Sequence, residues 1–168
     1  MAAVLDFIFL CYFITHIPIS IFVDAQVLLP KWIFPTKVVE LKAWYCTEFK
    51  DTMMIDPPAW FRTFVYCEFI FQFPFFIVAI YAFIKGIKNC SWIRTPMIVY
   101  SAHVATTTAA ICFHIMYNDF SKSKPIGPTT QLERQALLMF YFPYLLIPML
   151  MLTNFIFRAD LQTKHKMQ

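Results

Sequence analysis

The chain has 168 residues, the length of a single domain, and its composition is strongly apolar. Hydrophobic residues make up 60% of the chain and charged residues only 14%, whereas charged residues make up about 25% of a soluble domain. The net charge of +4 is spread along the chain, so no basic block or stripe indicates nucleic-acid binding. The composition predicts an integral membrane protein.

Four apolar segments are long enough to cross a bilayer, which takes about 20 residues. Because lipid offers no hydrogen-bond partner to the backbone, each segment is expected to be a helix. The sequence therefore predicts an all-α membrane protein, with a four-helix transmembrane bundle over residues 7–157 and a basic cytosolic tail over residues 158–168. The predicted spans are residues 7–29, 60–84, 96–117 and 136–157.

The orientation follows from the number of spans and from the basic residues. An even number of spans places both termini on the same side as the short turn 85–95, and the lysines and arginines there favour the cytosol. Near the C-terminus, Lys164 and Lys166 have the spacing of a dilysine retrieval signal for the endoplasmic reticulum. The alternative interpretation of these two lysines is a basic flank that stops transfer across the membrane.

Each predicted span carries one polar stripe. In the first span, polar residues recur every four positions and so share one side of a helix; they are Tyr12, His16, Ser20 and Asp24. An acid at the bilayer centre costs about 2.5–3.5 kcal/mol, so this side is expected to face protein or a cavity. The polar residues of the later spans are Glu68 and Gln72; Tyr100, His103, Thr107 and His114; and Tyr141 and Tyr144.

Prolines interrupt three of the predicted helices, at Pro18, at Pro74, and at Pro143 with Pro148. Each proline removes a backbone hydrogen bond and bends its helix. Bends at a similar depth open space inside a small bundle. The sequence therefore predicts proline-kinked helices around an internal ligand pocket, walled by aromatic side chains and holding a few acids.

Asp24 and Asp51, which lies in the loop between the first two spans, could form a carboxylate pair at this pocket. Two acids in a low-dielectric site repel each other, so one of them should hold a proton. The other could then receive a single positive charge on an apolar ligand. Two plainer interpretations stay open, namely Glu68 with Gln72 as a contact between helices, and His103 and His114 as hydrogen-bonded bundle histidines.

The sequence offers no pattern for a metal site or a cofactor. None of the five cysteines is paired at CxxC spacing, and His16 with Cys11, or His114 with Cys112, supplies only two ligands. No Ser-His-Asp arrangement and no phosphate-binding glycine loop is evident. We therefore expect neither a metal nor a cofactor.

Several motifs occur in a fixed order along residues 7–157: HIPISIFVDAQ, EFKD with PPAWF, CEFIFQFPFF, SWIRTP, DFSK and PYLLIP. Together they resemble the sterol- and amine-binding receptors of the EXPERA family, which is named partly for the emopamil-binding protein, a sterol isomerase. The resemblance implies a homodimer in the membrane of the endoplasmic reticulum or the nuclear envelope, with cytosolic termini. It also implies regulation of cellular cholesterol, with the Niemann-Pick type C cholesterol transporter as a partner.

The resemblance further implies binding of sterols, oxysterols and hydrophobic amines in the pocket. Asp24 would pair with the cation of a ligand, and Asp51 would support it. In the second span Glu68 and Gln72 match the family pattern, and Ile70 stands where contact with a sterol is expected. The other matching pocket positions are His16, Tyr45, Phe49, Thr107, Tyr141 and Tyr144.

Two functions other than that of a non-enzymatic receptor are compatible with these residues. A sterol double-bond isomerase would use Glu68 with Asp24 or Asp51 to move a proton. The isomerases resemble one another in an asparagine and a tryptophan of the last helix, where this chain has Tyr141 and Tyr144, which favours the receptor. A proton or ion pathway along the acids is disfavoured, because the prolines and aromatic residues indicate a closed pocket.

Overall fold

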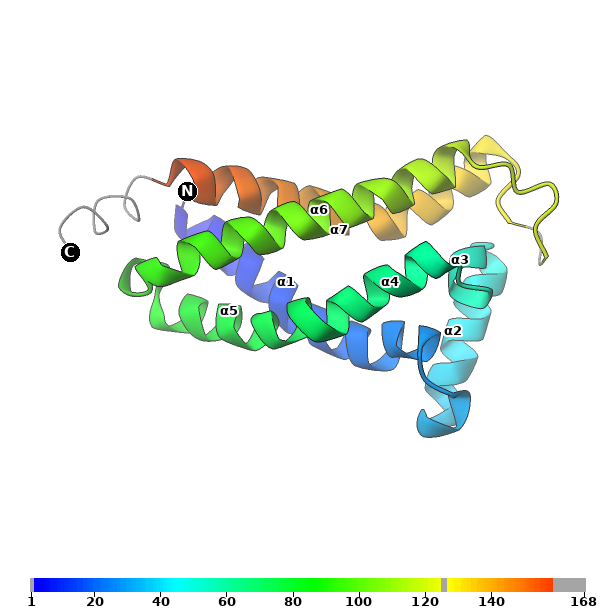
Figure 1. Ribbon diagram of the computed structural model, residues 1–168, viewed down its shortest axis with the longest axis horizontal. Helices are drawn as coiled ribbons and strands as arrows, with labels where there is room; N and C mark the ends of the chain where they lie inside the picture. The colour runs from blue at the N-terminus through cyan, green and yellow to red at the C-terminus, as the bar shows by residue number, and fades with distance from the viewer. Residues whose placement is uncertain (1, 125–126, 159–168) are drawn as a thin grey trace.

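The computed structural model describes residues 2–124 and 127–158, and within these residues it contains helices and turns but no strand. Four helical segments are long and apolar enough to cross a membrane, and they run side by side in a bundle (Figure 1). Their limits are Ala3–Val27, Ala59–Lys85, Ser91–Tyr117 and Gln131–Phe157. The prediction of an all-α protein with four membrane-spanning helices is confirmed. Lys164 and Lys166 lie outside the described residues.

The four spans are built from five long or medium helices, and two further helices lie between the first and second spans. The spans use α1 (Ala2–Phe22), α4 (Ala59–Cys67), α5 (Phe73–Lys85), α6 (Arg94–Tyr117) and α7 (Gln131–Phe157). The connecting helices are α2 (Thr36–Glu48) and α3 (Thr52–Ile55). Short 3₁₀ turns cover Asp24–Val27, Lys31–Ile33, Ile87–Asn89 and Ser91–Ile93.

The second span accommodates its proline by widening one turn. Between α4 and α5 lies a π-helical turn, Glu68–Gln72, in which the N–H of Phe73 reaches the carbonyl of Glu68 five residues earlier. Pro74 follows directly at the start of α5 and has no N–H to give to the turn before it. Single π turns inside α-helices are frequent at functional sites. The other three prolines, Pro18, Pro143 and Pro148, lie inside their helices.

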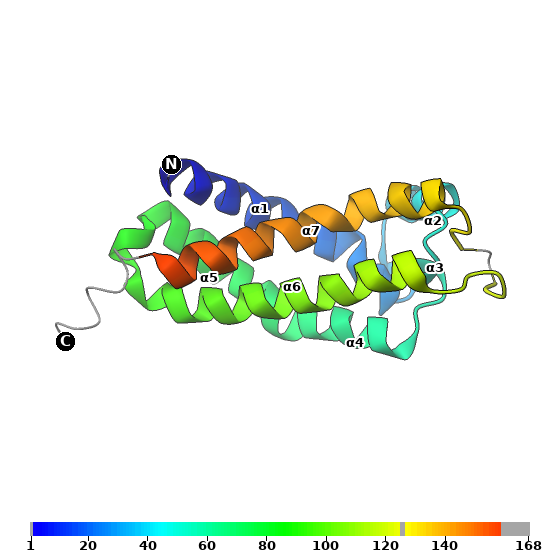
Figure 2. The same ribbon diagram turned by 90° about the horizontal axis from the view of Figure 1, so that it is seen from above.

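Two arginines fasten α6 to α7, which lie side by side in both ribbon views (Figures 1 and 2). At one end Arg94 donates to the carbonyl oxygens of Phe155 and Ile156, at 3.1 and 3.0 Å. At the other end Arg134 donates to three carbonyl oxygens at the C-terminus of α6. The last carbonyl groups of a helix have no hydrogen-bond partner within it. Each guanidinium donates hydrogen bonds to such groups, which lipid cannot do.

The N-terminus of α7 is fixed by a capping motif, which a hydropathy pattern does not detect. Thr130 and Glu133 form a capping box, in which the Thr130 hydroxyl accepts from the backbone N–H of Glu133 and the Glu133 carboxylate accepts from that of Thr130. This box satisfies two free N–H groups. The helix therefore begins at Gln131, earlier than the predicted span at residue 136.

Residues 36–55, which we call the lid, cross one end of the bundle (Figure 1). Seen from above, α2 and α3 remain at that end, while the start of α1, the end of α7 and the turn 86–93 lie at the other end (Figure 2). An ion pair of 2.5 Å joins Lys50 of the lid to Glu133 of α7. Lys50 has a left-handed backbone with φ of 55°, an uncommon conformation for a residue other than glycine.

Buried apolar side chains gather at both ends of the bundle. Near the chain ends the cluster includes Phe9, Phe13, Phe76, Met97 and Phe155, all with no exposed surface. Under the lid a second cluster includes Met53, Phe61, Val65, Ile115 and Leu137. The pocket predicted from the aromatic residues and the prolines lies next to this second cluster and opens beneath the lid.

Candidate ligand-binding pocket

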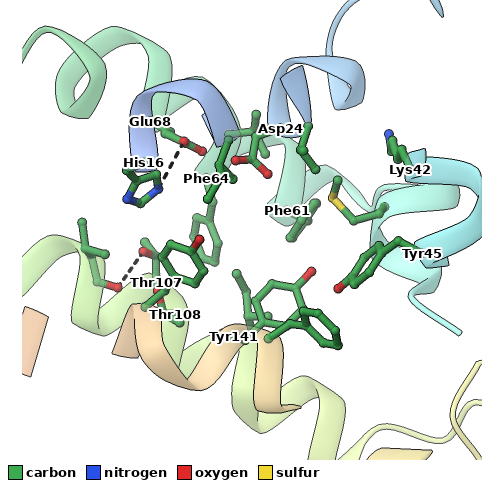
Figure 3. A pocket seen from close by; sticks show the side chains of 18 of the residues that line it. His16, Asp24, Lys42, Tyr45, Phe61, Phe64, Glu68, Thr107, Thr108 and Tyr141 are labelled. Carbon is green, nitrogen blue, oxygen red and sulfur yellow. Dashed lines mark hydrogen bonds and ion pairs between the residues drawn. The ribbon is translucent and has the colours of Figure 1, made fainter. Parts of the chain in front are cut away.

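A cavity of about 410 Å³ lies between the lid and the middle of the bundle (Figure 3). Its volume is in the range of small-molecule sites, and its walls are mostly apolar with a few polar side chains, as such sites usually are. All four spans and the lid contribute side chains to it. Eight of the eleven predicted site residues line this cavity: His16, Asp24, Tyr45, Glu68, Gln72, Thr107, Tyr141 and Tyr144.

The first span delivers Asp24 to the cavity through a change of helix type. The α-helix ends at Phe22, and Asp24 opens the 3₁₀ turn that follows. Asp24 is half-buried and lines the cavity wall. Figure 3 shows its carboxyl group between Glu68 on one side and Lys42 on the other. The acid at the end of the polar stripe of the first span therefore faces the pocket and not lipid.

Glu68 is the second acid of the cavity, and the first span holds it in place. Its carboxylate accepts a hydrogen bond from the Ser20 hydroxyl and lies 3.7 Å from Nε2 of His16. The other ring nitrogen of His16, Nδ1, is buried without a hydrogen-bond partner among the described residues. Because Glu68 opens the π turn, the widened backbone and the polar contact to α1 occur at the same place.

Asp51 lies behind the cavity wall and is fully buried. It caps α3 by accepting from the N–H of Met54 at 3.2 Å, and it accepts from the hydroxyls of Tyr141 at 2.7 Å and Tyr45 at 3.1 Å. Burial raises the pKa of its carboxyl group, and these hydrogen bonds partly oppose that rise. Asp51 thus positions two tyrosines whose side chains line the cavity.

This placement changes the expected carboxylate pair, because Asp51 acts on Asp24 through its charge but lies off the cavity wall. No hydrogen bond joins Asp51 to Asp24 in the described part of the chain, and Asp51 does not line the cavity. The physical reason is that Asp51 starts α3, where its carboxyl group turns towards the helix N–H groups and the tyrosines. Glu68, rather than Asp51, shares the cavity with Asp24.

Two other predicted site residues also lie off the cavity wall. Phe49 packs against the rings of Tyr45 and Phe140, with centroids 5.5 and 4.4 Å away, and so supports the wall from outside. Ile70 is 61% exposed. It stands two residues from both Glu68 and Gln72, which turn inwards, so it points to the opposite, outer side of the π turn.

Helix α2 contributes three cavity residues beside the predicted Tyr45 that sequence reasoning missed. Leu41, Lys42 and Trp44 line the cavity together with Tyr45. Lys42 is half-buried, and burial lowers the pKa of its ammonium group, which the charge of Asp24 partly counteracts. The spacing of Leu41, Trp44 and Tyr45 is that of one helix face, and this signal could have found them.

Further apolar and polar residues of the wall come from α4 and α6 at helical spacing. They are Phe61, Phe64 and Val65, and Val104, Thr108 and Ile111. Among the described residues, no group of three His, Cys, Asp or Glu side chains is placed to hold a metal ion. The arrangement can enclose an apolar body and offer it carboxyl, hydroxyl and amide groups.

Comparison with known proteins agrees with the motifs. The model of the family described as "EBP: EXPERA (EXPanded EBP superfamily)" matches residues 37–155. The chain is 50% identical over 165 residues to "Sigma intracellular receptor 2" of Xenopus tropicalis, covering 98% of this chain and 95% of that protein. It is 48% identical over 144 residues to the Homo sapiens protein of the same name, covering 84% and 81%.

A more distant relative is "Efficient mitochondria targeting-associated protein 19" of Schizosaccharomyces pombe, which is 27% identical over 150 residues, covering 88% of this chain and 72% of that protein. The family match covers well over half of the chain, and the relatives named as receptors align along most of their own length. With four apolar spans around an aromatic cavity, the chain belongs to the EXPERA family.

Proposed function

We propose that this protein is a receptor that binds sterols, oxysterols and hydrophobic amines in the cavity under the lid and thereby regulates cellular cholesterol homeostasis. The observation that carries the proposal is a partly open, mostly apolar cavity of about 410 Å³ with the carboxyl group of Asp24 on its wall. The similarity to proteins named as sigma receptors supports a receptor, and the family description supports a link to sterols.

The apolar part of a ligand gains most of its binding free energy from burial against aromatic walls. Phe61, Phe64 and Tyr141 present their rings to the cavity (Figure 3), and removal of apolar surface from water contributes about 25 cal/mol per Å². Entropy and polar desolvation offset a part of this gain. Shape and apolar surface therefore provide affinity for sterols and for the bodies of hydrophobic amines alike.

The polar groups of the cavity provide orientation. The carboxylate of Asp24 pairs with a ligand ammonium group, an interaction that strengthens where water is scarce. The Thr107 hydroxyl donates to backbone carbonyls of its own helix, and its oxygen accepts a hydrogen bond from a sterol hydroxyl. Asp51 supports the anchor indirectly, because it holds Tyr45 and Tyr141 in the wall.

A sterol double-bond isomerase is the second candidate function. The contact between His16 and Glu68 beside Asp24 favours it, since an acid and a base next to an apolar cavity could move a proton. The last helix places Tyr141 and Tyr144 in the wall, and the relatives are named as receptors. These observations favour binding without chemical conversion.

Incubation of the purified protein with a Δ8 sterol separates the two functions. Extracted lipid is analysed by chromatography and mass spectrometry for bound and converted sterol. The receptor proposal expects the sterol to be retained with its double bond in place. Recovery of a sterol with a moved double bond, and loss of that conversion in Glu68→Gln, would instead establish the isomerase.

We also propose a place in the cell and a set of partners. Both ends of the described chain lie at the same end of the bundle as the basic turn with Lys85, Lys88 and Arg94 (Figure 1), which supports cytosolic termini in the endoplasmic reticulum or the nuclear envelope. The proposed partners are a second copy of the chain and the Niemann-Pick type C cholesterol transporter. Protease protection of terminal tags, and co-purification of the transporter, test these proposals.

A further inference from the structure

The lid places a positive charge on the wall of a pocket whose other charged groups are acids. Lys42 of α2 lines the cavity together with Asp24 and Glu68. In Figure 3, Asp24 lies between Glu68 and Lys42, so the charges are ordered from negative to positive across the site. A pocket that only received cationic ligands would gain nothing from an ammonium group on its own wall, because like charges repel.

Lys42 is not held in direct contact by a carboxylate of the described chain. It is half-buried, and no ion pair joins it to an acid within the part of the chain that the structure describes. Lys31 adds a second positive charge close enough to act on it electrostatically, and Asp24 and Asp51 act on it with the opposite sign. A partly dehydrated ammonium group without a carboxylate in direct contact still has hydrogen-bond donors that an anion can satisfy.

Lys42 also lies where the cavity opens. Its neighbours Leu41 and Trp44 line the cavity while each remaining 57% exposed, and Phe140 of α7 lines it while 44% exposed. Residues that both line a cavity and remain exposed mark its mouth, here between α2 and α7. An amphiphile with its apolar body inside the cavity would therefore bring a polar group at one end next to Lys42.

We propose that the pocket binds sterols that carry an anionic ester, such as a sulfate, with the ester at the mouth against Lys42 and the ring system inside the cavity. This inference rests on the proposed function, because it names a ligand class for the same site. A sulfate monoester is fully ionised at neutral pH, and the compact ammonium of a lysine binds such oxygens as a point charge. The same charge opposes an amine held at Asp24.

A change at Lys42 should therefore shift the affinities for anionic and for cationic ligands in opposite directions. We would measure binding of a sterol sulfate, its neutral parent sterol and a hydrophobic amine to the full chain in nanodiscs of zwitterionic lipid. Lys42→Gln is expected to lower the affinity for the sterol sulfate roughly tenfold. It should leave the affinity for the neutral sterol unchanged and raise the affinity for the amine. Lys42→Arg, which keeps the charge, is expected to retain sulfate binding.

Lys37→Gln is the matched control, since Lys37 is exposed on the same helix and does not line the cavity; it is expected to change none of the three affinities. The inference is overturned if Lys42→Gln leaves sulfate binding unchanged, or if it weakens all three ligands equally, as a structural role would. If the unmodified protein binds neither the sulfate nor the parent sterol, the proposed function fails and this inference fails with it.

Discussion

The carboxyl group of Asp51 accepts a hydrogen bond of 2.7 Å from the hydroxyl of Tyr141, although 90 residues separate them along the chain. The bond joins the lid to the last span at the edge of the ligand cavity. Tyr45 donates to the same oxygen at 3.1 Å. A change at any of these three groups should therefore affect both the stability of the lid and the shape of the pocket.

Tyr141→Phe removes one donor from a fully buried carboxyl group. Because an unsatisfied buried polar group costs about 1–3 kcal/mol, we expect a lower free energy of unfolding and a lower melting temperature in detergent. Tyr144→Phe is the matched control, since Tyr144 lines the same cavity and no hydrogen bond of its hydroxyl is seen in the described chain. Equal melting temperatures of the two variants would contradict the role given to Asp51.

The pH dependence of stability reports on Asp51 directly. Burial raises the pKa of this carboxyl group above its ordinary value of 3.8, so the folded protein favours the protonated form. Its contribution to stability is fully present below pH 3.8 and is lost as the pH rises through the raised pKa.

Asp51→Asn cannot titrate, so we expect its melting temperature to fall less than that of the unmodified protein as the pH rises. The comparison is made by thermal unfolding across that pH range. Parallel curves for the two proteins would show that Asp51 is not the group responsible. Because asparagine caps a helix about as well as aspartate, Asp51→Asn should retain the cap of α3.

Because the backbone of Lys50 is left-handed, glycine should destabilise the fold less than alanine at this position. Lys50→Gly and Lys50→Ala both remove the ion pair with Glu133, but only glycine adopts a φ of 55° without steric cost. We expect Lys50→Gly to be more stable than Lys50→Ala by about 1 kcal/mol. Chemical unfolding of the two variants measures this difference, and an alanine variant as stable as the glycine variant would contradict it.

The hydrogen bond between Ser20 and Glu68 predicts a local effect on ligand binding. Ser20→Ala leaves Glu68 beside His16 without its hydroxyl donor, and a lost hydrogen bond to a charged group costs about 1.5–3 kcal/mol. We expect weaker sterol binding together with lower stability, measured by ligand retention and thermal unfolding. Ser101→Ala serves as the control, because the Ser101 hydroxyl is buried without a partner in the described chain; an equal loss in both variants would contradict the account.

Hydropathy and the polar stripes predicted much of this site. The apolar segments predicted the four spans, and the spacing of His16, Asp24, Glu68 and Gln72 predicted which helix faces turn inwards. All four residues line one cavity. These features are local in the sequence, because the period of a helix fixes which residues share a side.

The features that sequence reasoning missed depend on contacts between distant segments. Lys42 became part of the pocket because residues 36–48 fold into a helix across the mouth, which the apolar pattern of the spans did not indicate. Asp51 lost its expected place beside Asp24 because it caps a four-residue helix, α3, and meets Tyr141. By contrast, the outward direction of Ile70 follows from its position two residues from both Glu68 and Gln72, a local spacing that the sequence already contains.

The most direct test of the central claim is the affinity of a hydrophobic amine for Asp24→Asn, measured with the purified protein beside a neutral sterol. We predict that the amine loses at least tenfold in affinity, or about 1.4 kcal/mol, while the sterol retains its affinity. The melting temperature should match that of Asp119→Asn, a control at an exposed acid that does not line the cavity. Undiminished binding of the amine to Asp24→Asn would contradict the claim that Asp24 is the polar anchor of the pocket.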